Sequence, residues 1–125
     1  MKILIIDAAN DKIFFKAIDK DKSYTTEHLN NRENFNNFAP LLFNFVEKSN
    51  LKMKNFKKIF INQGPGKFSG IRTSISVIKS ICIVNNIDLY GFRTCQFVDQ
   101  NHEKLLILAN NGALKKNLIK PNYSS

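Results

Sequence analysis

Short apolar runs alternate with polar turns over the first quarter of the chain. Continuous runs rich in β-branched residues cover residues 2–6 and 12–18, and a shorter one covers residues 23–26. Runs of this length, separated by turn residues, are typical of strands, and short connections place successive strands side by side. The pattern therefore predicts an antiparallel three-stranded meander at the start of the fold.

A helical pattern follows a polar, asparagine-rich stretch at residues 30–37. Apolar residues recur three and four positions apart over residues 35–46 and 71–85, which predicts two amphipathic helices. The second helix ends at two asparagines, which favour a left-handed cap. Apolar runs at residues 58–62 and 88–92 predict two strands, and the helix between them makes these strands parallel.

The last part of the chain is expected to hold one more helix and one more strand. Thr94 is a suitable cap for a short helix, residues 104–109 are apolar enough for a strand, and residues 110–125 form a polar tail. The order of elements predicts an α/β fold with a mixed sheet of five or more strands and helices packed on it. We expect a single domain over residues 1–125, with its core at about residues 1–109.

The second helix carries two apolar stripes, and a sheet covers only one of them. The other stripe needs either the first helix or another chain as its partner, and both alternatives are open at this stage. We expect the two helices to leave apolar surface through which the chain self-associates, with two-fold symmetry. The candidate interface residues are Phe38, Leu41, Leu42, Phe45, Ile71, Ser74, Val77, Ile78 and Ile81.

Length and composition are those of an ordinary globular domain with a basic surface. Hydrophobic residues make up 43% of the 125 residues, which is enough for a core. The net charge of +9 comes mainly from lysines that are dispersed along the sequence, apart from short clusters at residues 52–58 and 115–120. Dispersal favours a solvated basic surface. Attraction to RNA is the alternative, because phosphate contacts need little more than positive charge.

The apolar runs and the two cysteines predict the compartment and the redox state of the protein. No apolar run approaches the length of a membrane span, and the apolar start, Met1 to Asp7, is too short for a signal peptide. We therefore expect a cytoplasmic protein that does not contact a membrane. Cys82 and Cys95 fit no metal spacing and are expected to be reduced thiols, with Cys82 in the core.

The stretch GPGKFSGIR, residues 64–72, concentrates three of the five glycines between a predicted strand and a predicted helix. A phosphate loop of the Walker type needs Ser or Thr after the lysine, but Phe68 follows Lys67. A dinucleotide fingerprint needs glycines two and then three residues apart, whereas these are two and then four apart. Two interpretations stay open. One is a tight structural turn in which Gly64 and Gly66 supply unusual backbone angles and Ser69 caps the helix; the other is a ligand contact at the helix start.

Catalytic and metal-binding constellations are not expected. The two histidines, His28 and His102, are far apart and fall on predicted loops, so a metal site is not predicted. A nuclease of the ribonuclease H type needs converging carboxylates, and the strand at residues 58–62 ends without one. Asp7 is then expected to be a turn or helix-capping acid, with metal ligation as the alternative. Ser69 has no histidine partner nearby in the sequence, so protease activity is not expected.

The glycine stretch resembles the Gly-Pro-Gly-Ser-Phe-Thr-Gly-hydrophobic-Arg signature of the TsaB (YeaZ) family. The opening MKILIIDAAN, the Phe38-Ala-Pro40 segment and the stretch NNIDLYGFRT are also similar to that family, in the same order, over roughly residues 1–100. The matching signature residues are Gly64, Pro65, Gly66, Phe68, Ser69, Gly70 and Arg72.

The resemblance implies a ribonuclease-H-like lobe of the actin, sugar-kinase and heat-shock ATPase superfamily. It also implies a non-catalytic relative of TsaD, the enzyme that transfers a threonylcarbamoyl group to an adenosine next to the tRNA anticodon. Such a relative pairs with TsaD through helices of the first lobe, is joined by the ATPase TsaE, contacts tRNA through the complex, and needs no cofactor or metal. Asp7 would be a vestigial acid of a nucleotide site. The alternatives are a small nucleotide- or RNA-binding module without the TsaD partnership and a divergent nuclease.

Three departures from the family pattern bear on these expectations. Family members carry a second lobe, which is expected to be absent here, either naturally or because the sequence is a piece of a longer protein. Ala8 and Ala9 replace hydroxyl residues that often follow the aspartate of the first strand, and Lys67 replaces the serine of the loop. The first two departures argue against ATP hydrolysis, which needs phosphates clamped between two lobes.

Overall fold

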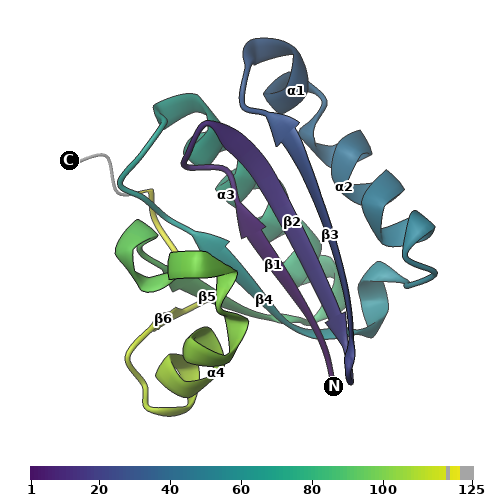
Figure 1. The fold of residues 1–125 in the computed structure, drawn as a ribbon, viewed down its shortest axis with the longest axis vertical. Coiled ribbons are helices and arrows are strands. Elements are labelled where there is room, and N and C mark those ends of the chain that lie inside the picture. The colour runs from purple at the N-terminus through teal and green to yellow at the C-terminus, as the bar shows by residue number, and fades with distance from the viewer. Residues whose placement is uncertain (118, 122–125) are drawn as a thin grey trace.

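Six strands form one mixed sheet in the order β3–β2–β1–β4–β5–β6 (Figure 1), in a computed structural model that describes residues 1–117 and 119–121. The strands are β1 (Lys2–Asp7), β2 (Lys12–Asp19), β3 (Lys22–Leu29), β4 (Phe56–Asn62), β5 (Asp88–Phe92) and β6 (Lys115–Lys116). β1, β2 and β3 pair antiparallel, while β4 is parallel to both β1 and β5. The predicted meander and the predicted parallel pair are confirmed.

Four helices and three short 3₁₀ turns connect these strands. The helices are α1 (Arg32–Asn36), α2 (Phe38–Lys48), α3 (Phe68–Asn85) and α4 (His102–Asn110), and the turns are η1 (Met53–Asn55), η2 (Thr94–Gln96) and η3 (Val98–Gln100). α3 ends at Asn86 in the left-handed region, with φ of 54°, as predicted. Within the described residues, no helix combines the length and the apolar character that crossing a membrane requires.

The sheet is covered on both faces, which explains why its central strands are continuously apolar. Side chains alternate along a strand, so Leu4 and Ile6 of β1 join the core beneath α2 and α3, while Ile3 and Ile5 join the core that includes Leu105 of α4. Figure 1 shows α2 and α3 on one side of the sheet and α4 on the other.

The core between the sheet and the first two long helices is organised around an aromatic ring. The ring of Phe15 lies 5.6 Å from that of Phe38 and 5.8 Å from that of Phe45, both on α2. The ring centroids of His28 and Phe15 are 6.2 Å apart. Aromatic rings at these separations attract one another beyond the effect of burial, so α2 is fixed against β2.

Most of the predicted interface residues lie inside the chain. Nearly all of them are 9% exposed or less, namely Phe38, Leu42, Phe45, Ile71, Ser74, Ile78 and Ile81. Leu41 and Val77 are half-buried and pack against the same core. The expectation of an apolar surface at the seven buried positions is therefore wrong, because these side chains pack in the core between the sheet, α2 and α3. Among the α3 side chains that the structure describes, the large apolar ones that are mostly exposed are Ile83 and Val84, at its last turn.

Residues 104–109, predicted as a strand, belong to α4. The side chain of Asn101 accepts hydrogen bonds from the backbone N–H groups of Glu103 (3.1 Å) and Lys104 (3.4 Å), which starts the helix. Leu105 is fully buried, whereas Ile107 is 59% exposed. The apolar run misled the prediction because only part of it faces the core.

The predicted polar tail is partly a structural element. β6 pairs antiparallel with β5, the N–H of Asn117 donates to the Leu89 carbonyl at 2.7 Å, and the N–H of Leu89 donates to the Asn117 side chain at 3.0 Å. Leu114 joins the core that contains Leu105, while Ile119 is fully buried on the opposite face of the sheet. The core therefore extends to residue 119; residues 118 and 122–125 of the predicted tail lie outside the described residues.

Replacing Ile119 with Ala should lower the free energy of unfolding by about 2–4 kcal/mol, because the substitution leaves a cavity in a packed core. Lys115→Ala, in the same segment but exposed, is the control and should change it by less than about 0.5 kcal/mol. Urea denaturation of both variants measures the difference. Equal stability of the two variants would show that the segment is not part of the core.

Candidate functional site

Three polar side chains meet where β1, β4 and β5 end. The Asn62 Nδ2 donates to Asp7 Oδ1 at 3.1 Å and lies 3.2 Å from Thr94 Oγ1, while its Oδ1 accepts the N–H of Gly64 at 2.8 Å. The Thr94 hydroxyl donates to the Pro65 carbonyl at 2.6 Å. Adjacent parallel strands end at the same edge of a sheet, so residues far apart in sequence meet there.

Asp7 is enclosed by hydrogen-bond donors. Besides Asn62, its carboxylate accepts the backbone N–H of Ala9 at 3.1 Å and the side-chain amide of Asn10 at 3.2 Å. Burial raises the pKa of Asp7, and the bonds from Ala9, Asn62 and Asn10 oppose that rise. In this structure Asp7 ties the turn after β1, which is one of the two roles that the sequence predicted for it.

The glycine loop packs directly on the turn after β1. The N–H of Lys67 donates to the Ala9 carbonyl at 2.7 Å, and a Cβ atom added at Gly66 would overlap the same carbonyl oxygen. The positive φ in the loop belongs to Gly64, at 107°, which precedes a cis peptide bond to Pro65. The expectation of an unusual backbone angle is confirmed at Gly64 and is wrong at Gly66, where closeness to Ala9, and not the backbone angle, excludes a side chain.

A second close approach fixes the start of α3. A Cβ atom at Gly70 would overlap the carbonyl oxygen of Ala8, and Asn30 donates to that oxygen at 2.8 Å. Ala8 and Ala9 are both buried, at 0% and 2% exposure. Small residues at these four positions therefore let the loop, the turn after β1 and the segment after β3 meet.

Two predicted caps are not formed by the expected side chains. α3 begins at Phe68 with Lys67 as its N-cap, and no side chain caps it, so Ser69 lies inside the first turn instead. Thr94 begins η2, but its hydroxyl bonds to Pro65 rather than to its own helix. The Gln96 side chain accepts the N–H of Arg93 at 2.8 Å at the start of η2, which leaves the Thr94 hydroxyl for the loop. The Phe68 side chain lies outside what the structure describes.

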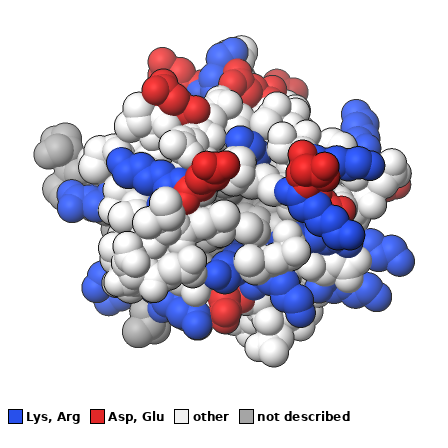
Figure 2. Space-filling model, turned by 60° about the horizontal axis from the view of Figure 1, so that its bottom comes forward, with Lys and Arg blue, Asp and Glu red and all other residues white. Residues whose placement is uncertain are grey.

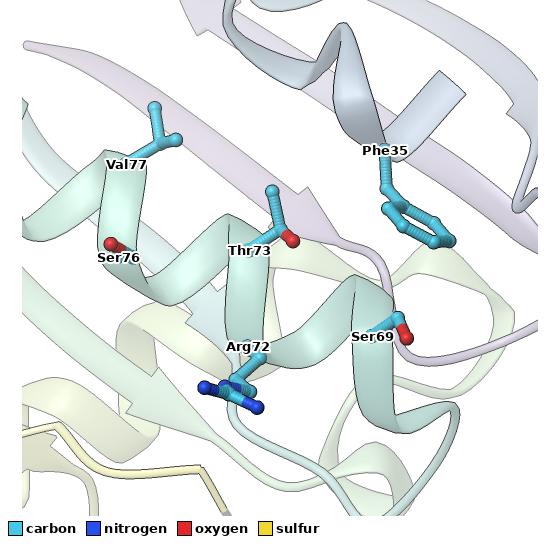
Figure 3. A pocket seen from close by; sticks show the side chains of 6 residues that line it. All are labelled: Phe35, Ser69, Arg72, Thr73, Ser76 and Val77. Atoms are coloured by element: carbon cyan, nitrogen blue, oxygen red, sulfur yellow. The ribbon is translucent and has the colours of Figure 1, made fainter. Parts of the chain in front are cut away.

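The outer side of α3 borders a cavity of about 410 Å³ (Figure 3). Signature residues Ser69 and Arg72 line it, together with Thr73, Ser76 and Val77 of the same helix and Phe35 across from them on α1. Signature residues Gly64, Gly66 and Gly70 are instead engaged in packing and turn formation. The signature therefore serves two places: a buried junction and an exposed helix face.

Another cavity, of about 330 Å³, lies beside Asp7. Phe14 and Phe97 provide aromatic walls, and the other lining residues are Asp7, Asn10, Asp11, Lys12, Glu27, Asp99 and Gln100. Four carboxylates against one lysine make the cavity negative, which disfavours a phosphate.

The described residues contain no group of three or more His, Cys, Asp or Glu side chains that could hold a metal ion. His28 lies on β3 and His102 begins α4, so neither is on a loop as predicted. Cys82 is a buried core residue, as expected, and burial together with the charge of Asp88 raises its pKa to about 12. Cys95 is exposed, and both cysteines are free thiols.

Sequence reasoning missed Asn62, Thr94 and Asn30 as the residues that hold this end of the molecule together. Asn62 is fully buried at the end of an apolar strand. A polar residue that ends a buried strand must find partners, and that signal was present in the sequence. Which partners it finds depends on the strand order, which the sequence alone leaves open.

Comparisons with known proteins agree with the fold and the loop. Residues 28–119 match the family described as "TsaD: tRNA N6-adenosine threonylcarbamoyltransferase". The chain is 26% identical, over 98 residues, to the tRNA threonylcarbamoyladenosine biosynthesis protein TsaB of Buchnera aphidicola subsp. Schizaphis graminum, covering 78% of this chain and 47% of that protein.

Solved structures show the same architecture. YeaZ from Pseudomonas aeruginosa superposes with a TM-score of 0.72 at 14% identity, over 89% of this chain and 50% of YeaZ. RuvC from T. thermophilus, solved with a Holliday junction substrate, has a TM-score of 0.58 at 7% identity, over 93% of this chain and 99% of RuvC. The chain thus has a ribonuclease-H-like α/β fold and spans about half the length of its TsaB and YeaZ relatives.

The fold and the loop junction define a ribonuclease-H-like lobe whose glycine loop sets a helix against the sheet. The chain belongs to the TsaD family, and within that family it resembles the relative named TsaB.

Gly66→Val should destabilise the protein by about 1–3 kcal/mol, because the new side chain overlaps the Ala9 carbonyl and must displace the loop. Thermal and urea unfolding measure the loss. Lys67→Ala, beside it, removes only an exposed ion pair to Asp11 (3.3 Å) and should change stability by less than about 1 kcal/mol. An unchanged melting temperature for Gly66→Val would contradict the close approach.

Asp7→Asn should change how stability depends on pH. Because the pKa of Asp7 is higher in the folded than in the unfolded protein, its contribution to stability is full below the unfolded value of 3.8 and is lost as pH rises through the folded value. The variant lacks this loss, so its stability relative to wild type should rise as pH increases from 3.8 through the folded value. Urea unfolding across this range tests the sign, and a difference that is constant with pH would refute it.

Proposed function

We propose that the protein is a non-catalytic subunit of the machinery that makes N6-threonylcarbamoyladenosine in tRNA, and that it pairs with TsaD. The observation that carries the proposal is the family match over residues 28–119, together with the relative named as a tRNA threonylcarbamoyladenosine biosynthesis protein. The proposal places the protein in the cytoplasm with tRNA, in a complex that TsaE joins.

The geometry around Asp7 supports a non-catalytic role. The carboxylate is satisfied by Ala9, Asn10 and Asn62, and the N–H of Lys67 is used by the Ala9 carbonyl, so these groups are committed to packing. The cavity next to Asp7 has a negative lining, which disfavours a nucleotide phosphate. We therefore treat Asp7 as a vestigial acid and expect neither ATP hydrolysis nor tight binding of a transition metal.

The outward face of α3 is the proposed pairing surface. Val77 is half-buried there, Ile83 and Val84 are 81% and 82% exposed at its end, and Leu41 lies on the neighbouring α2. The small side chains Ser69, Thr73, Ser76 and Ser80 leave room for another helix to approach closely. The same surface would support a two-fold homodimer when TsaD is absent.

Reconstitution tests the function. The protein is mixed with TsaD, TsaE and an unmodified tRNA transcript under conditions that supply the substrates of the reaction, and the modified nucleoside is quantified by mass spectrometry. We expect modification that depends on this chain and on TsaD together. The alternative function, a nucleotide- or RNA-binding module without TsaD, predicts tRNA or nucleotide binding but no dependence of the modification on this chain.

Val77→Glu should weaken pairing with TsaD and self-association while leaving the fold intact. An unpaired charge buried at an interface costs several kcal/mol, enough to abolish a micromolar complex. The control is Ile107→Glu on α4, 59% exposed and on the opposite side of the sheet.

Copurification with tagged TsaD and sedimentation of the free chain measure both assemblies, and circular dichroism checks the fold. Ile81→Glu is unsuitable as a test, because Ile81 is 9% exposed and its replacement would disturb the core. Retention of TsaD by the Val77 variant would refute this surface as the pairing site.

A further inference from the structure

The end of the sheet opposite the glycine loop is strongly basic. β1, β3, β4 and β5 begin at this end. β2 ends there, because it runs antiparallel to its neighbours β1 and β3. The segments at this end are residues 1–2, 19–22, 52–58 and 86–88. They hold seven lysines against three aspartates; the lysines are Lys2, Lys20, Lys22, Lys52, Lys54, Lys57 and Lys58.

This concentration is a property of one end and not of the whole surface. At the other end of the strands, residues 7–12, 29–31, 62–67 and 93–100 hold three acidic and three basic side chains. Figure 2, with the former end turned toward the viewer, shows Lys and Arg around much of the face, separated by uncharged surface, and fewer Asp and Glu among them. Seven lysines from four separate segments of the sequence therefore lie at one end of the sheet.

The strand registers explain the gathering. Lys2 stands opposite Asp19 on β2, and Asp19 stands opposite Lys22 on β3, while Lys58 stands beside both Ile3 and Asp88. A chain that runs back and forth in short strands returns to the same edge every few residues. Lysines placed at strand starts and turns then meet at that edge.

The charges at this edge are available to a partner. Five of the seven lysines, all but Lys2 and Lys58, are exposed, and within the described residues none of the seven forms an ion pair. Lys58 lies over the ring of Tyr90 at 5.6 Å, and Asp88 is paired with Lys116 at 3.6 Å, which removes part of the opposing negative charge. The edge of five strands is about 20 Å wide, enough to meet several phosphates of a nucleic-acid backbone.

We propose that this lysine edge binds the phosphate backbone of tRNA. RNA is favoured over a membrane because an interfacial membrane site needs a broad apolar face beside its cations. Among the described residues, the large apolar side chains exposed near this end are Met1, Ile83 and Val84, which do not form such a face. The choice of tRNA among RNAs rests on the proposed function. The inference that this edge binds an RNA backbone rests on the lysines alone. The basic end adjoins the last turn of α3, but Lys22 and Lys54 lie on β3 and η1, so these lysines can hold tRNA while the outward face of α3 holds TsaD.

A matched pair of double variants tests the inference. Lys22→Glu with Lys54→Glu reverses two charges at the edge, and Arg32→Glu with Lys104→Glu reverses two exposed charges elsewhere, so both proteins have the same net charge. Binding of a fluorescent unmodified tRNA transcript to the full chain is measured by anisotropy at several salt concentrations.

The edge variant should bind tRNA at least about tenfold more weakly, and its salt dependence should fall by about two phosphate contacts, whereas the control should stay within about threefold of wild type. If both variants lost tRNA affinity equally, the loss would be explained by net charge alone, and the proposal would be overturned. Absence of tRNA binding by the wild type, with lysine-dependent binding to phosphatidylserine vesicles, would overturn it in favour of a membrane.

Copurification with TsaD separates this inference from the proposed function. The edge variant should retain TsaD, because its substitutions lie away from the outward face of α3, and a loss of TsaD together with tRNA would overturn the assignment of two separate surfaces. If the wild type binds tRNA through the edge but never pairs with TsaD, the proposed function fails and the basic edge stands. Circular dichroism and urea unfolding of the edge variant verify that the fold is unchanged.

Discussion

The buried amide of Asn62 joins three strands at one end of the sheet. Its nitrogen needs acceptors and its oxygen needs a donor, and Asp7, Thr94 and the N–H of Gly64 supply them. A buried amide without partners would cost free energy, so this network specifies how the ends of β1, β4 and β5 are placed. The glycine loop leaves β4 from that fixed point, and α3 begins where the loop ends.

The contact of the loop with Ala8 and Ala9 also determines how α3 packs on the core. Because Gly66 and Gly70 have no side chains, the loop and the helix start reach the carbonyl groups of the turn after β1. α3 is then held at a depth where its inner stripe meets the sheet and Ile81 of its second stripe is buried in the same core. An apolar surface expected from the helix alone is therefore mostly core, and the exposed part shrinks to the last turn and a few half-buried positions.

The two ends of the sheet have different chemistry for the same topological reason. At the carboxyl ends of the parallel strands, the polar groups form hydrogen bonds with one another, and the neighbouring cavity is lined by carboxylates. At the amino ends, lysines from several turns collect with few opposing charges. The lobe thus has a packed junction at one end and a lysine-rich surface at the other. This division supports the proposed role of the protein as a partner-binding subunit.

The sequence by itself determined the meander, the parallel pair, the two long helices and the left-handed end at Asn86, because each depends on local periodicity and turn chemistry. It also carried the loop signature on which the family resemblance rests. Tertiary structure decided the rest. Residues 104–109 became a helix because Asn101 caps them and Leu105 faces the core, and Ile119 became buried because β6 adds to the sheet edge. The roles of Gly66, Asn62 and the dispersed lysines depend on which distant segments meet, and periodicity along a chain contains no information about such meetings.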